Sequence, residues 1–268
     1  MSWCLRSKEK KMHTKETLLR DLSNLKIDPK GTLLIHSSMK AIGEVEGGAD
    51  TVIDVLMEYM KDGLLILPTH TWNQMNEKYN VFNVKTEQSC VGLLTNVFRV
   101  RPGVKRSLHP THSVAAFGND AEEYIAGEEN SHSPCAKGGC WEKLLLRGAQ
   151  VLFLGCNLTK NTFIHGVEEW NDIPNRLTKE PQPFFTIDEN GEKHDTYQYR
   201  HHCEPPATEV SQYYGKMEPA FLRGGAIYYG VFGDAKCIVG DTVKMYAITS
   251  RYLKKDEHLF DDGTPLAE

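Results

Sequence analysis

The strongest constraint on the fold is a strand, loop, helix and strand in the first quarter of the chain. Residues 32–38 (TLLIHSS) begin as an apolar, β-prone run and end in polar side chains, as a buried strand does at a sheet edge. Asp50 is placed to cap a helix whose apolar residues recur at helical spacing over 52–60. Residues 64–67 form a second strand before Pro68. This βαβ order predicts an α/β protein that binds ligands at the carboxyl ends of its strands.

The rest of the chain continues the alternation of helices and strands. Helices are expected over residues 92–99, 141–146 and 162–170, strands over residues 114–117 and 150–154, and a last helix over residues 241–253. No internal repeat, low-complexity tract or linker interrupts the pattern. These features predict a single large domain.

Capping and turn residues indicate where elements begin and end. Asn119 with Glu122 forms a capping-box signature, and Asn161 and Asp241 are placed to cap the helices that follow them. The Asn-Gly pair at 190–191 is typical of a hairpin turn between two short strands. A hairpin is antiparallel, so we expect a mixed sheet.

The composition excludes several classes of function. Of 268 residues, 40% are hydrophobic, which supplies a sizeable core and excludes a mainly disordered chain. With 31 Lys plus Arg against 36 Asp plus Glu, the net charge of −5 lacks the basic field of a nucleic-acid binder and suits a cationic partner. No apolar run approaches the roughly 20 residues that span a bilayer. The basic N-terminus has no apolar stretch behind it, so we expect a cytoplasmic protein without membrane contact.

The seven cysteines are an odd number scattered over a long chain, which favours reduced thiols over a disulfide framework. Cys156 follows an apolar run, where a buried and inert thiol is expected. His132, Cys135 and Cys140 form one group of candidate metal ligands, and residues 201–203 (HHC) form another. Their spacings differ from that of a zinc knuckle. We therefore expect no metal, while both groups stay open as candidates.

Residues 161–170 (NTFIHGVEEW) carry the most informative pattern for chemistry. Thr162, His165 and Glu168 are spaced three apart, so on a helix they share one face. A carboxylate beside a histidine raises the basicity of the imidazole and fixes its tautomer, as a general base requires. Taken alone, such a pair is more often a solvated surface pair. Its position after the strand and glycine of VLFLGC favours the functional interpretation, because it places the helix at the strand ends.

Two further polar segments fall at predicted strand ends or in loops. His36, Ser37 and Ser38 precede a glycine-containing loop and offer hydroxyls and amides to a pyrophosphate or a pantetheine arm. Residues 105–113 (KRSLHPTHS) combine two cations with hydroxyls and histidines, which suits a phosphate-bearing ligand. A plain turn and a solvated basic loop explain these compositions equally well. Neither GxSxG nor HExxH occurs.

Five segments, in this order and at these separations, resemble the aminoglycoside 3-N-acetyltransferase family, also called antibiotic N-acetyltransferases. They are HSSMKAIGEVEGG, KRSLHPTHSVAAFG, SHSP, VLFLGCNLTKNTFIHGVEE and GDAKC. The resemblance covers roughly residues 15–255, leaving 1–14 as a flexible N-terminus and 256–268 as a C-terminal tail. It implies a three-layer α/β/α fold with a mixed sheet, acetyl-CoA as donor and an amine as acceptor.

The resemblance implies roles for individual residues. His165 matches the family's catalytic histidine, Glu168 the acidic residue on the same helix face, and Thr162 the hydroxyl next to the thioester. The implied reaction is direct acetyl transfer, in which His165 takes the proton of the attacking amine. The Thr162 hydroxyl or a nearby amide stabilises the oxyanion, and no covalent intermediate on Cys156 is needed.

The resemblance and the residue patterns together predict the binding residues. The expected contacts to acetyl-CoA are His36, Ser37, Ser38, Arg106, Ser107 and Ser113. The expected contacts to the acceptor are Trp72, His132, Glu168 and His201. Acidic residues expected to attract the amine are Glu44, Glu46, Glu168 and Glu169.

The acceptor is expected to be an aminoglycoside or a related amino compound. Arg200 and His201 occupy a stretch where antibiotic-modifying relatives often present carboxylates, which predicts weak or narrow aminoglycoside acetylation. The natural acceptor stays open, as does a role in antibiotic resistance. The expected partners are a small-molecule amine and no nucleic acid, with a homodimer as an open alternative.

One rival from another enzyme class is a metal-dependent amidohydrolase. Its scattered ligands would be His109, His112, His132, His201, His202 and Cys203. A non-catalytic CoA-binding protein that keeps the fold is a third alternative. Stoichiometric zinc would favour the hydrolase, while turnover with any amine would exclude the binding protein.

Overall fold

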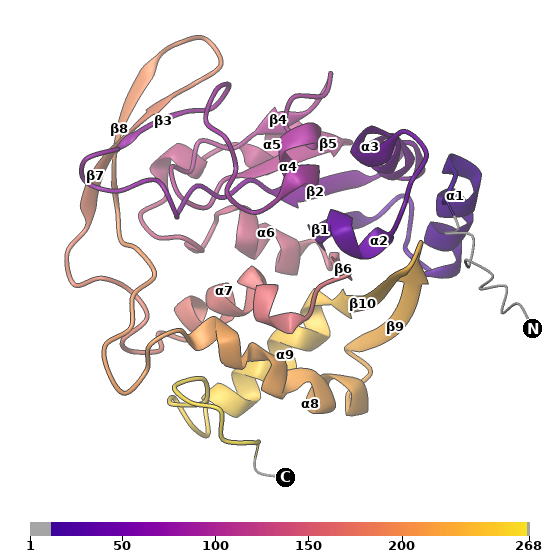
Figure 1. Cartoon of the computed structure of the whole chain (residues 1–268). Helices are drawn as coiled ribbons and strands as arrows, with labels where there is room; N and C mark the ends of the chain where they lie inside the picture. Colours follow the sequence, from indigo (N-terminus) through magenta and orange to yellow (C-terminus); the bar gives the residue numbers. More distant parts are fainter. Residues whose placement is uncertain (1–11, 267–268) are drawn as a thin grey trace, which may run out of the picture.

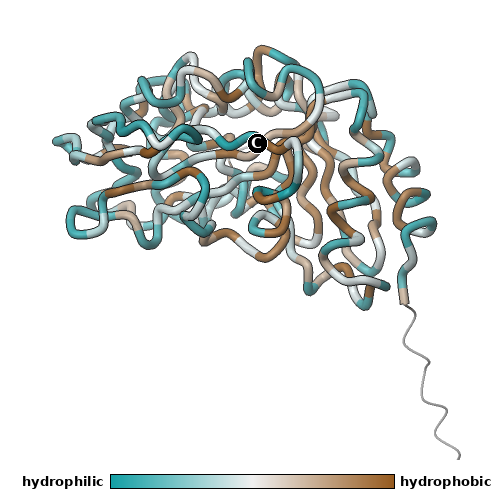
Figure 2. The backbone as a smooth tube through the Cα atoms, turned by 90° about the horizontal axis from the view of Figure 1, so that it is seen from above, coloured by the Kyte–Doolittle hydropathy of each residue, from teal (hydrophilic) through white to brown (hydrophobic). Residues whose placement is uncertain are grey.

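Alternating apolar side chains on the strands build a sheet between two helical layers. The computed structural model describes residues 12–266. On β1 (Thr32–Ser37), Leu34 packs into the core on one face, whereas Leu33 and Ile35 pack into the core on the other. Figure 2 shows the hydrophobic segments gathered along the central strands. Both faces of the sheet are therefore buried, as expected for an α/β protein.

The large sheet has seven strands and is mixed (Figure 1). In spatial order its strands are β4 (Lys105–Arg106), β5 (Val114–Gly118), β2 (Leu64–Pro68), β1, β6 (Gln150–Leu154), β10 (Ala235–Asp241) and β9 (Ile227–Phe232). The central strands β2, β1 and β6 are parallel, while β5 pairs antiparallel with β2 and β10 pairs antiparallel with β6. The predicted mixed sheet is confirmed.

Helices cover both faces of this sheet. One layer holds α1 (Lys15–Asn24), α2 (Met39–Ile42), α3 (Gly48–Tyr59) and α4 (Leu93–Phe98). The other holds α5 (Ala121–Ile125), α6 (Cys140–Leu146), α7 (Thr162–Trp170), α8 (Glu218–Arg223) and α9 (Thr242–Leu253), with the 3-10 segments η1 (Glu128–Asn130), η2 (Leu158–Lys160) and η3 (Val210–Met217). Figure 1 shows α3 and α4 on one side of the sheet and α7 and α9 on the other. The predicted three-layer α/β/α architecture is confirmed.

The predicted hairpin forms, but outside the large sheet. Strands β7 (Gln182–Ile187) and β8 (Lys193–Gln198) pair antiparallel, and with β3 (Val81–Asn83) they make a separate three-stranded sheet. This sheet projects to the left in Figure 1 and has a small core of its own around Phe82 and Phe184. The hairpin is therefore the wrong reason for a mixed sheet, which owes that character to antiparallel β5 and β10.

Helix starts differ from expectation where glycine or a left-handed residue takes the capping position. Helix α3 follows Gly47, so Asp50 lies in its first turn instead of at its N-cap. The capping box at Asn119 does not form, because Asp120 is the N-cap and Asn119 donates to the carbonyl of Asp62. Asp241 does cap α9, accepting a hydrogen bond from the Lys244 amide at 3.0 Å.

The ends of the predicted domain are better ordered than expected. Residues 1–11 of the predicted flexible N-terminus lie outside the described range, and within it His13 is 3% exposed and lies 3.0 Å from Asp234. Residues 256–268 were expected to form a C-terminal tail outside the domain, with residues 261–268 frayed, yet Leu259 and Phe260 are buried in the core. The folded unit therefore reaches beyond residue 255. Within residues 12–266, no helix combines the length and the apolar character that crossing a membrane requires.

Candidate active site

The carboxyl ends of β1 and β6 mark a change in the direction of winding. The chain leaves β1 for α2 and α3 in one layer, and leaves β6 for α7 in the opposite layer. Such a switch point opens a crevice between the two strand ends, where α/β proteins bind ligands. A cavity of about 870 Å³ lies here, as the β1 residues His36 and Ser37 and the β6 neighbours Gly155 and Cys156 all line it.

Glycine is required where the chain turns out of β6. Gly155 has φ +69°, and a Cβ there would lie 2.3 Å from the Cβ of Ala41. Beside it, the Ser38 amide donates to the carbonyl of Leu154 at 2.8 Å. The close approach brings the start of α2 against the loop that leads to α7, and Ser37 and Ser38 line the same cavity as Thr162, the first residue of α7.

His165 on α7 lines the cavity and is held from behind by Tyr214. The Tyr214 hydroxyl lies 2.6 Å from Nδ1 of His165 and donates to Oε2 of Glu168 at 2.5 Å. Since that hydrogen points to the carboxylate, the hydroxyl oxygen can accept from Nδ1–H of the imidazole. Nε2 then keeps its lone pair, as a general base requires.

Glu168 lies beneath His165 and not in the cavity. Its side chain is 1% exposed, and Oε1 accepts from Nε of Arg176 at 2.5 Å. Arg176 in turn reaches Asp261 at 2.8 Å, which joins the last part of the fold to the His165–Glu168 pair, the dyad. Burial raises the pKa of Glu168, and Arg176 acts against that rise. With both oxygens engaged, Glu168 does not present a carboxylate to an acceptor, so its expected substrate contact is wrong.

His201 packs over His165 on the cavity side. The two rings are stacked, with centroids 4.0 Å apart, and Nε2 of His201 lies 3.0 Å from Oε1 of Glu169. Burial lowers the pKa of His165 well below its usual value and that of His201 to about 3. Burial also raises the pKa of Glu169 to about 7. His165 is therefore neutral at pH 7 and free to take a proton.

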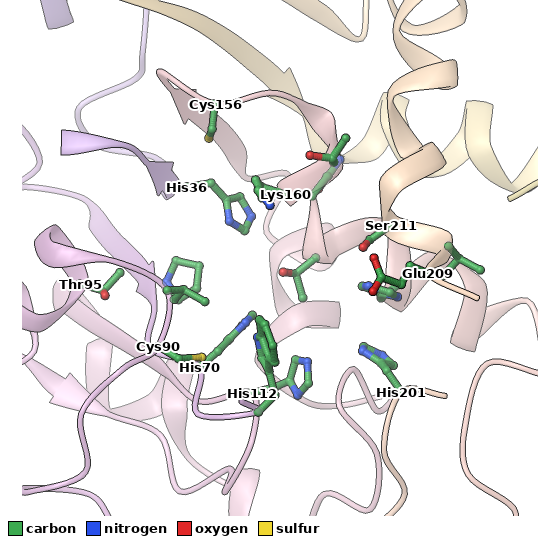
Figure 3. A pocket seen from close by; sticks show the side chains of 18 of the residues that line it. His36, His70, Cys90, Thr95, His112, Cys156, Lys160, His201, Glu209 and Ser211 are labelled. Carbon is green, nitrogen blue, oxygen red and sulfur yellow. The ribbon is translucent and has the colours of Figure 1, made fainter. Parts of the chain in front are cut away.

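Further histidines line the same cavity, and Figure 3 shows four of them from different segments. These are His36, His70, His112 and His201. The ring of His36 stacks on Phe153 with centroids 5.3 Å apart, and burial lowers the pKa of His36 to about 3. Within residues 12–266, Nε2 of His36 and Nε2 of His70 have no hydrogen-bond partner. The cavity wall thus carries neutral imidazoles that can donate or accept hydrogen bonds.

Only the first of the two predicted CoA-binding segments reaches the cavity. His36, Ser37 and Ser38 line it, together with Thr162 at the start of α7. Within the described part of the chain, the hydroxyls of Ser37 and Ser38 have no hydrogen-bond partner, so both can form hydrogen bonds with an acetyl-CoA molecule.

Arg106, Ser107 and Ser113, which were predicted to contact acetyl-CoA, do not line the cavity and are hydrogen-bonded within the protein. Arg106 is 4% exposed and donates to the carbonyls of Thr69 and Glu87, while its guanidinium lies over the ring of Phe82. Arg106 lies on the short strand β4, where its side chain is buried. Ser107 accepts from the Val114 amide at 3.1 Å, and Ser113 donates to the Thr69 carbonyl at 2.9 Å. The polar groups satisfy buried backbone atoms instead of a ligand.

Of the residues predicted to contact the acceptor, some line the cavity and others do not. Trp72 and His201 line the cavity, and Trp72 is 45% exposed. His132 is exposed elsewhere, with Nδ1 3.3 Å from the carbonyl of Tyr197. The expected acidic lining is wrong as well, because Glu44, Glu46 and Glu169 do not line the cavity. Among the lining residues in the described range, Glu209 is the only carboxylate, against Lys160, Arg176 and Arg200.

The thiols and the predicted metal ligands do not assemble a second active site. Burial raises the pKa of Cys156 to about 12, which leaves its thiol protonated and weakly nucleophilic. Two groups in residues 12–266 bring three ligand atoms within 4.8 Å: Cys135, Glu169 and His201, and on the hairpin Asp188, Glu192 and His194. Neither group is one of the predicted sets.

Sequence reasoning missed Tyr214 and Arg176, which hold the dyad. Tyr214 lies on the 3-10 segment η3, 49 positions from His165, and Arg176 lies in a loop after α7. No periodicity connects these segments with α7. The nearest signal was the spacing of His165 and Glu168, which predicted that both lie on one helix face. It did not predict that Tyr214 lies between their side chains or that Arg176 pairs with Glu168.

Comparison with known sequences decides the family. The profile of the family described as aminoglycoside 3-N-acetyltransferase matches residues 34–254. The chain belongs to this family. The resemblance inferred from the motifs is therefore confirmed, as are the acyltransferase class and acetyl-CoA as the co-substrate of the family.

Individual relatives of the family are similar along nearly the whole chain. Aminoglycoside N(3)-acetyltransferase III of Acinetobacter baumannii is 26% identical over 273 residues, covering 91% of this chain and 92% of its own. A solved structure of AAC-IIIb with CoASH covers 95% of this chain and 100% of its own at 22% identity, with a TM-score of 0.78. A mutant of AAC(3)-IVa in complex with a gentamicin covers 95% and 93% at 22% identity, with a TM-score of 0.80. These structures confirm the fold.

Proposed function

We propose that this chain transfers the acetyl group of acetyl-CoA directly to an amine, with His165 as the general base. The observation that carries the proposal is the placement of His165 in the cavity at the strand ends, with Tyr214 and Glu168 behind its Nδ1. Family membership supplies the reaction class.

The donor end of the cavity is the side formed by β1 and the loop before α7. Ser37 and Ser38 offer unpaired hydroxyls, and Lys160 offers a cation to the phosphates of a CoA molecule. This segment would leave the thioester near Thr162, the first residue of α7. The amide groups of the first helical turn and the Thr162 hydroxyl are then the donors available to an oxyanion.

Each bond in the reaction has a partner in this arrangement. The amine nitrogen attacks the thioester carbonyl as Nε2 of His165 takes its proton, and the carbonyl becomes a tetrahedral oxyanion. Collapse of that intermediate breaks the carbon–sulfur bond. The imidazolium returns the proton to the departing CoA thiolate, so His165 is neutral again at the end of the cycle.

Tyr214 connects the developing imidazolium with the buried carboxylate. When Nε2 gains a proton, Nδ1–H donates to the Tyr214 oxygen while the Tyr214 hydroxyl donates to Glu168. Hydrogen bonds to charged groups are about twice as strong as neutral ones, so this chain favours the protonated base in the transition state. Glu168 thus orients His165 through Tyr214.

The acceptor we propose is an amine of an aminoglycoside or a related amino compound. Support comes from the relatives, whose names describe aminoglycoside N(3)-acetyltransferases and one of which was solved with a gentamicin. In that case the chain would also contribute to antibiotic resistance.

Release of free thiol from acetyl-CoA tests the proposal. Thiol release that depends on an added amine, and that is lost in His165→Gln, is the expected result. Acetyl-CoA hydrolysis at the same rate with and without any amine would contradict it. Calorimetry with CoA provides an independent readout, with micromolar binding, about −8 kcal/mol, as the expected value.

A further inference from the structure

Arg200 is a cation on the cavity wall without a carboxylate partner. No aspartate or glutamate oxygen within the described residues 12–266 lies within 4.0 Å of its guanidinium. Its one hydrogen bond from the guanidinium runs from Nη2 to the backbone carbonyl of Trp72 at 2.8 Å. Arginine stays protonated in proteins, so this side chain brings a full positive charge to the cavity with most of its donors unused.

The position of Arg200 is on the acceptor side. The next residue, His201, stacks on the base His165, and the carbonyl that Arg200 contacts belongs to Trp72, whose partly exposed side chain lines the same cavity. Figure 3 shows His201 across the cavity from Cys156 and Lys160, which lie at the donor end. A ligand whose amine faces His165 would therefore have the Arg200–Trp72 pair within reach.

Other carboxylates do not neutralise this charge. Glu168 is committed to Arg176 and Tyr214, and Glu169 is committed to Ser133 and His201. Glu209 lines the cavity as its one carboxylate in the described range, but makes no ion pair with Arg200. The wall therefore disfavours a polycation and favours an anion at Arg200.

We propose that Arg200 and Trp72 form a subsite for a carboxylate on the acceptor. Of the two acceptor classes in the proposed function, the related amino compounds are then preferred over the polycationic aminoglycosides, and the best acceptor is an aryl or alkyl amine that also carries a negative charge. The guanidinium fork matches the geometry of a carboxylate, and the Trp72 side chain provides an apolar face for the body of the molecule. This inference rests on the proposed function, because it names the substrate class of the same site.

A matched series of three amines tests the subsite. 4-(Aminomethyl)benzoate, benzylamine and 4-(aminomethyl)benzylamine share the reacting aminomethyl group and the ring, and differ only in carrying a carboxylate, nothing or a second ammonium. The expected order of kcat/KM is carboxylate, then neutral, then dication, with at least about tenfold between the first and the last. Equal rates, or a preference for the diamine, would overturn the proposal.

Variants assign the preference to Arg200. Arg200→Gln should lower kcat/KM for the carboxylate at least about tenfold and change that for benzylamine less than about threefold. Arg200→Glu should reverse the order of the series. Arg223→Gln, an exposed arginine on α8, is the matched control and should change none of these values. An unchanged preference in Arg200→Gln would contradict the assignment.

Three further outcomes separate failure of the subsite from failure of the proposed function. A rise in KM for acetyl-CoA in Arg200→Gln, with equal losses for all three amines, would place Arg200 at the donor and overturn the subsite alone. Fast acetylation of gentamicin, unaffected by Arg200→Gln, would also overturn the subsite and support the transferase. Absence of thiol release with every amine, gentamicin included, together with absence of CoA binding would overturn both.

Discussion

Nδ1 of His165 lies 3.8 Å from the nearest carboxylate oxygen of Glu168, which is too far for a hydrogen bond. The hydroxyl of Tyr214 fills the gap, within 2.6 Å of the imidazole and 2.5 Å of the carboxylate. His165 and Glu168 are thus joined by a third side chain from a distant segment. The arrangement makes Tyr214 a positioning residue whose loss can be separated from the loss of the base.

Removal of the base should abolish most of the chemistry and leave donor binding intact. His165→Gln is expected to lower kcat by roughly 100- to 10,000-fold, because a positioned general base contributes that much. CoA affinity should stay within about threefold by calorimetry, since the role proposed for His165 is to take a proton from the acceptor amine. His132→Gln, at an exposed histidine outside the cavity, is the control. A near-normal rate in His165→Gln would reduce α7 to a structural role.

Removal of the Tyr214 hydroxyl, which connects His165 with Glu168, should lower kcat less than removal of His165 does. Tyr214→Phe keeps the ring and deletes the hydroxyl, and a hydrogen bond to a charged group is worth about 1.5–3 kcal/mol. The expected loss in kcat is therefore about 10- to 100-fold. Glu168→Gln should cause a loss of similar size, and the double variant should lose little more than either single variant, because both act through one chain of hydrogen bonds. Fully additive losses would show that Glu168 acts without Tyr214.

Substitution should affect donor binding at Ser37 and Ser38, which line the cavity, and stability at Ser107 and Ser113, which do not. Ser38→Ala is expected to raise KM for acetyl-CoA with little change in stability, because its hydroxyl makes no hydrogen bond in the described chain and lines the cavity. Ser113→Ala should leave that KM unchanged and lower the free energy of unfolding by about 1–3 kcal/mol, since it leaves buried partners unsatisfied. Steady-state kinetics and urea unfolding measure the two effects. A raised KM in Ser113→Ala alone would restore the second segment to the donor site.

Mild acid should destabilise the fold steeply. Burial lowers the pKa of His36, His70, His109, His112, His165 and His201. Below about pH 6.5 these histidines bind protons in the unfolded chain but not in the folded one, so stability falls as the pH drops, and each contributes up to about 1.4 kcal/mol per pH unit.

Three buried carboxylates oppose this trend, because burial raises the pKa values of Glu128, Glu168 and Glu169. The pKa values of Glu128 and Glu169 are raised to about 7, so their contribution to stability grows as the pH falls from 7 toward the value of an unfolded glutamate. The histidines outnumber them, and the expected net loss between pH 7 and pH 5 is on the order of 5 kcal/mol. Urea unfolding at pH 7, 6 and 5 measures it. His36→Phe should make the dependence shallower, whereas a flat profile in the wild type would show that the histidines are not held neutral.

Strand ends and one helix face were predictable because their signals are local. Ser37 and Ser38 follow an apolar run directly, and Thr162 and His165 share a face of a helix that follows a strand and a glycine. Because helices cover both faces of the sheet, these side chains are expected to come together at the carboxyl ends of the strands. The same reasoning failed at Arg106, because polar composition does not distinguish a loop that binds a ligand from one that turns inward to satisfy buried carbonyls.

Long-range partners were not predictable for a different reason. Tyr214 and Arg176 reach Glu168 only because η3 and the loop after α7 pack together around the end of the chain. Nothing in the residues beside Tyr214 marks it as a partner of His165, since its role depends on packing between segments distant in sequence. The charge of the cavity was unpredictable for the same reason, since it depends on which segments pack around it. Glu44 and Glu46 are acidic residues, but they do not line the cavity.

The ring of Phe260 packs edge-on against the ring of Tyr214, with centroids 4.8 Å apart, and Asp261 holds the arginine that pairs with Glu168. During synthesis on the ribosome, helix α7 is therefore complete long before Phe260 and Asp261, which contact Tyr214 and Arg176 behind His165, have been added to the chain. Catalytic competence would switch on only once residues 259–261 have emerged and docked. A purification tag or reporter fused close to this segment would disturb the chemistry from residues that do not line the cavity.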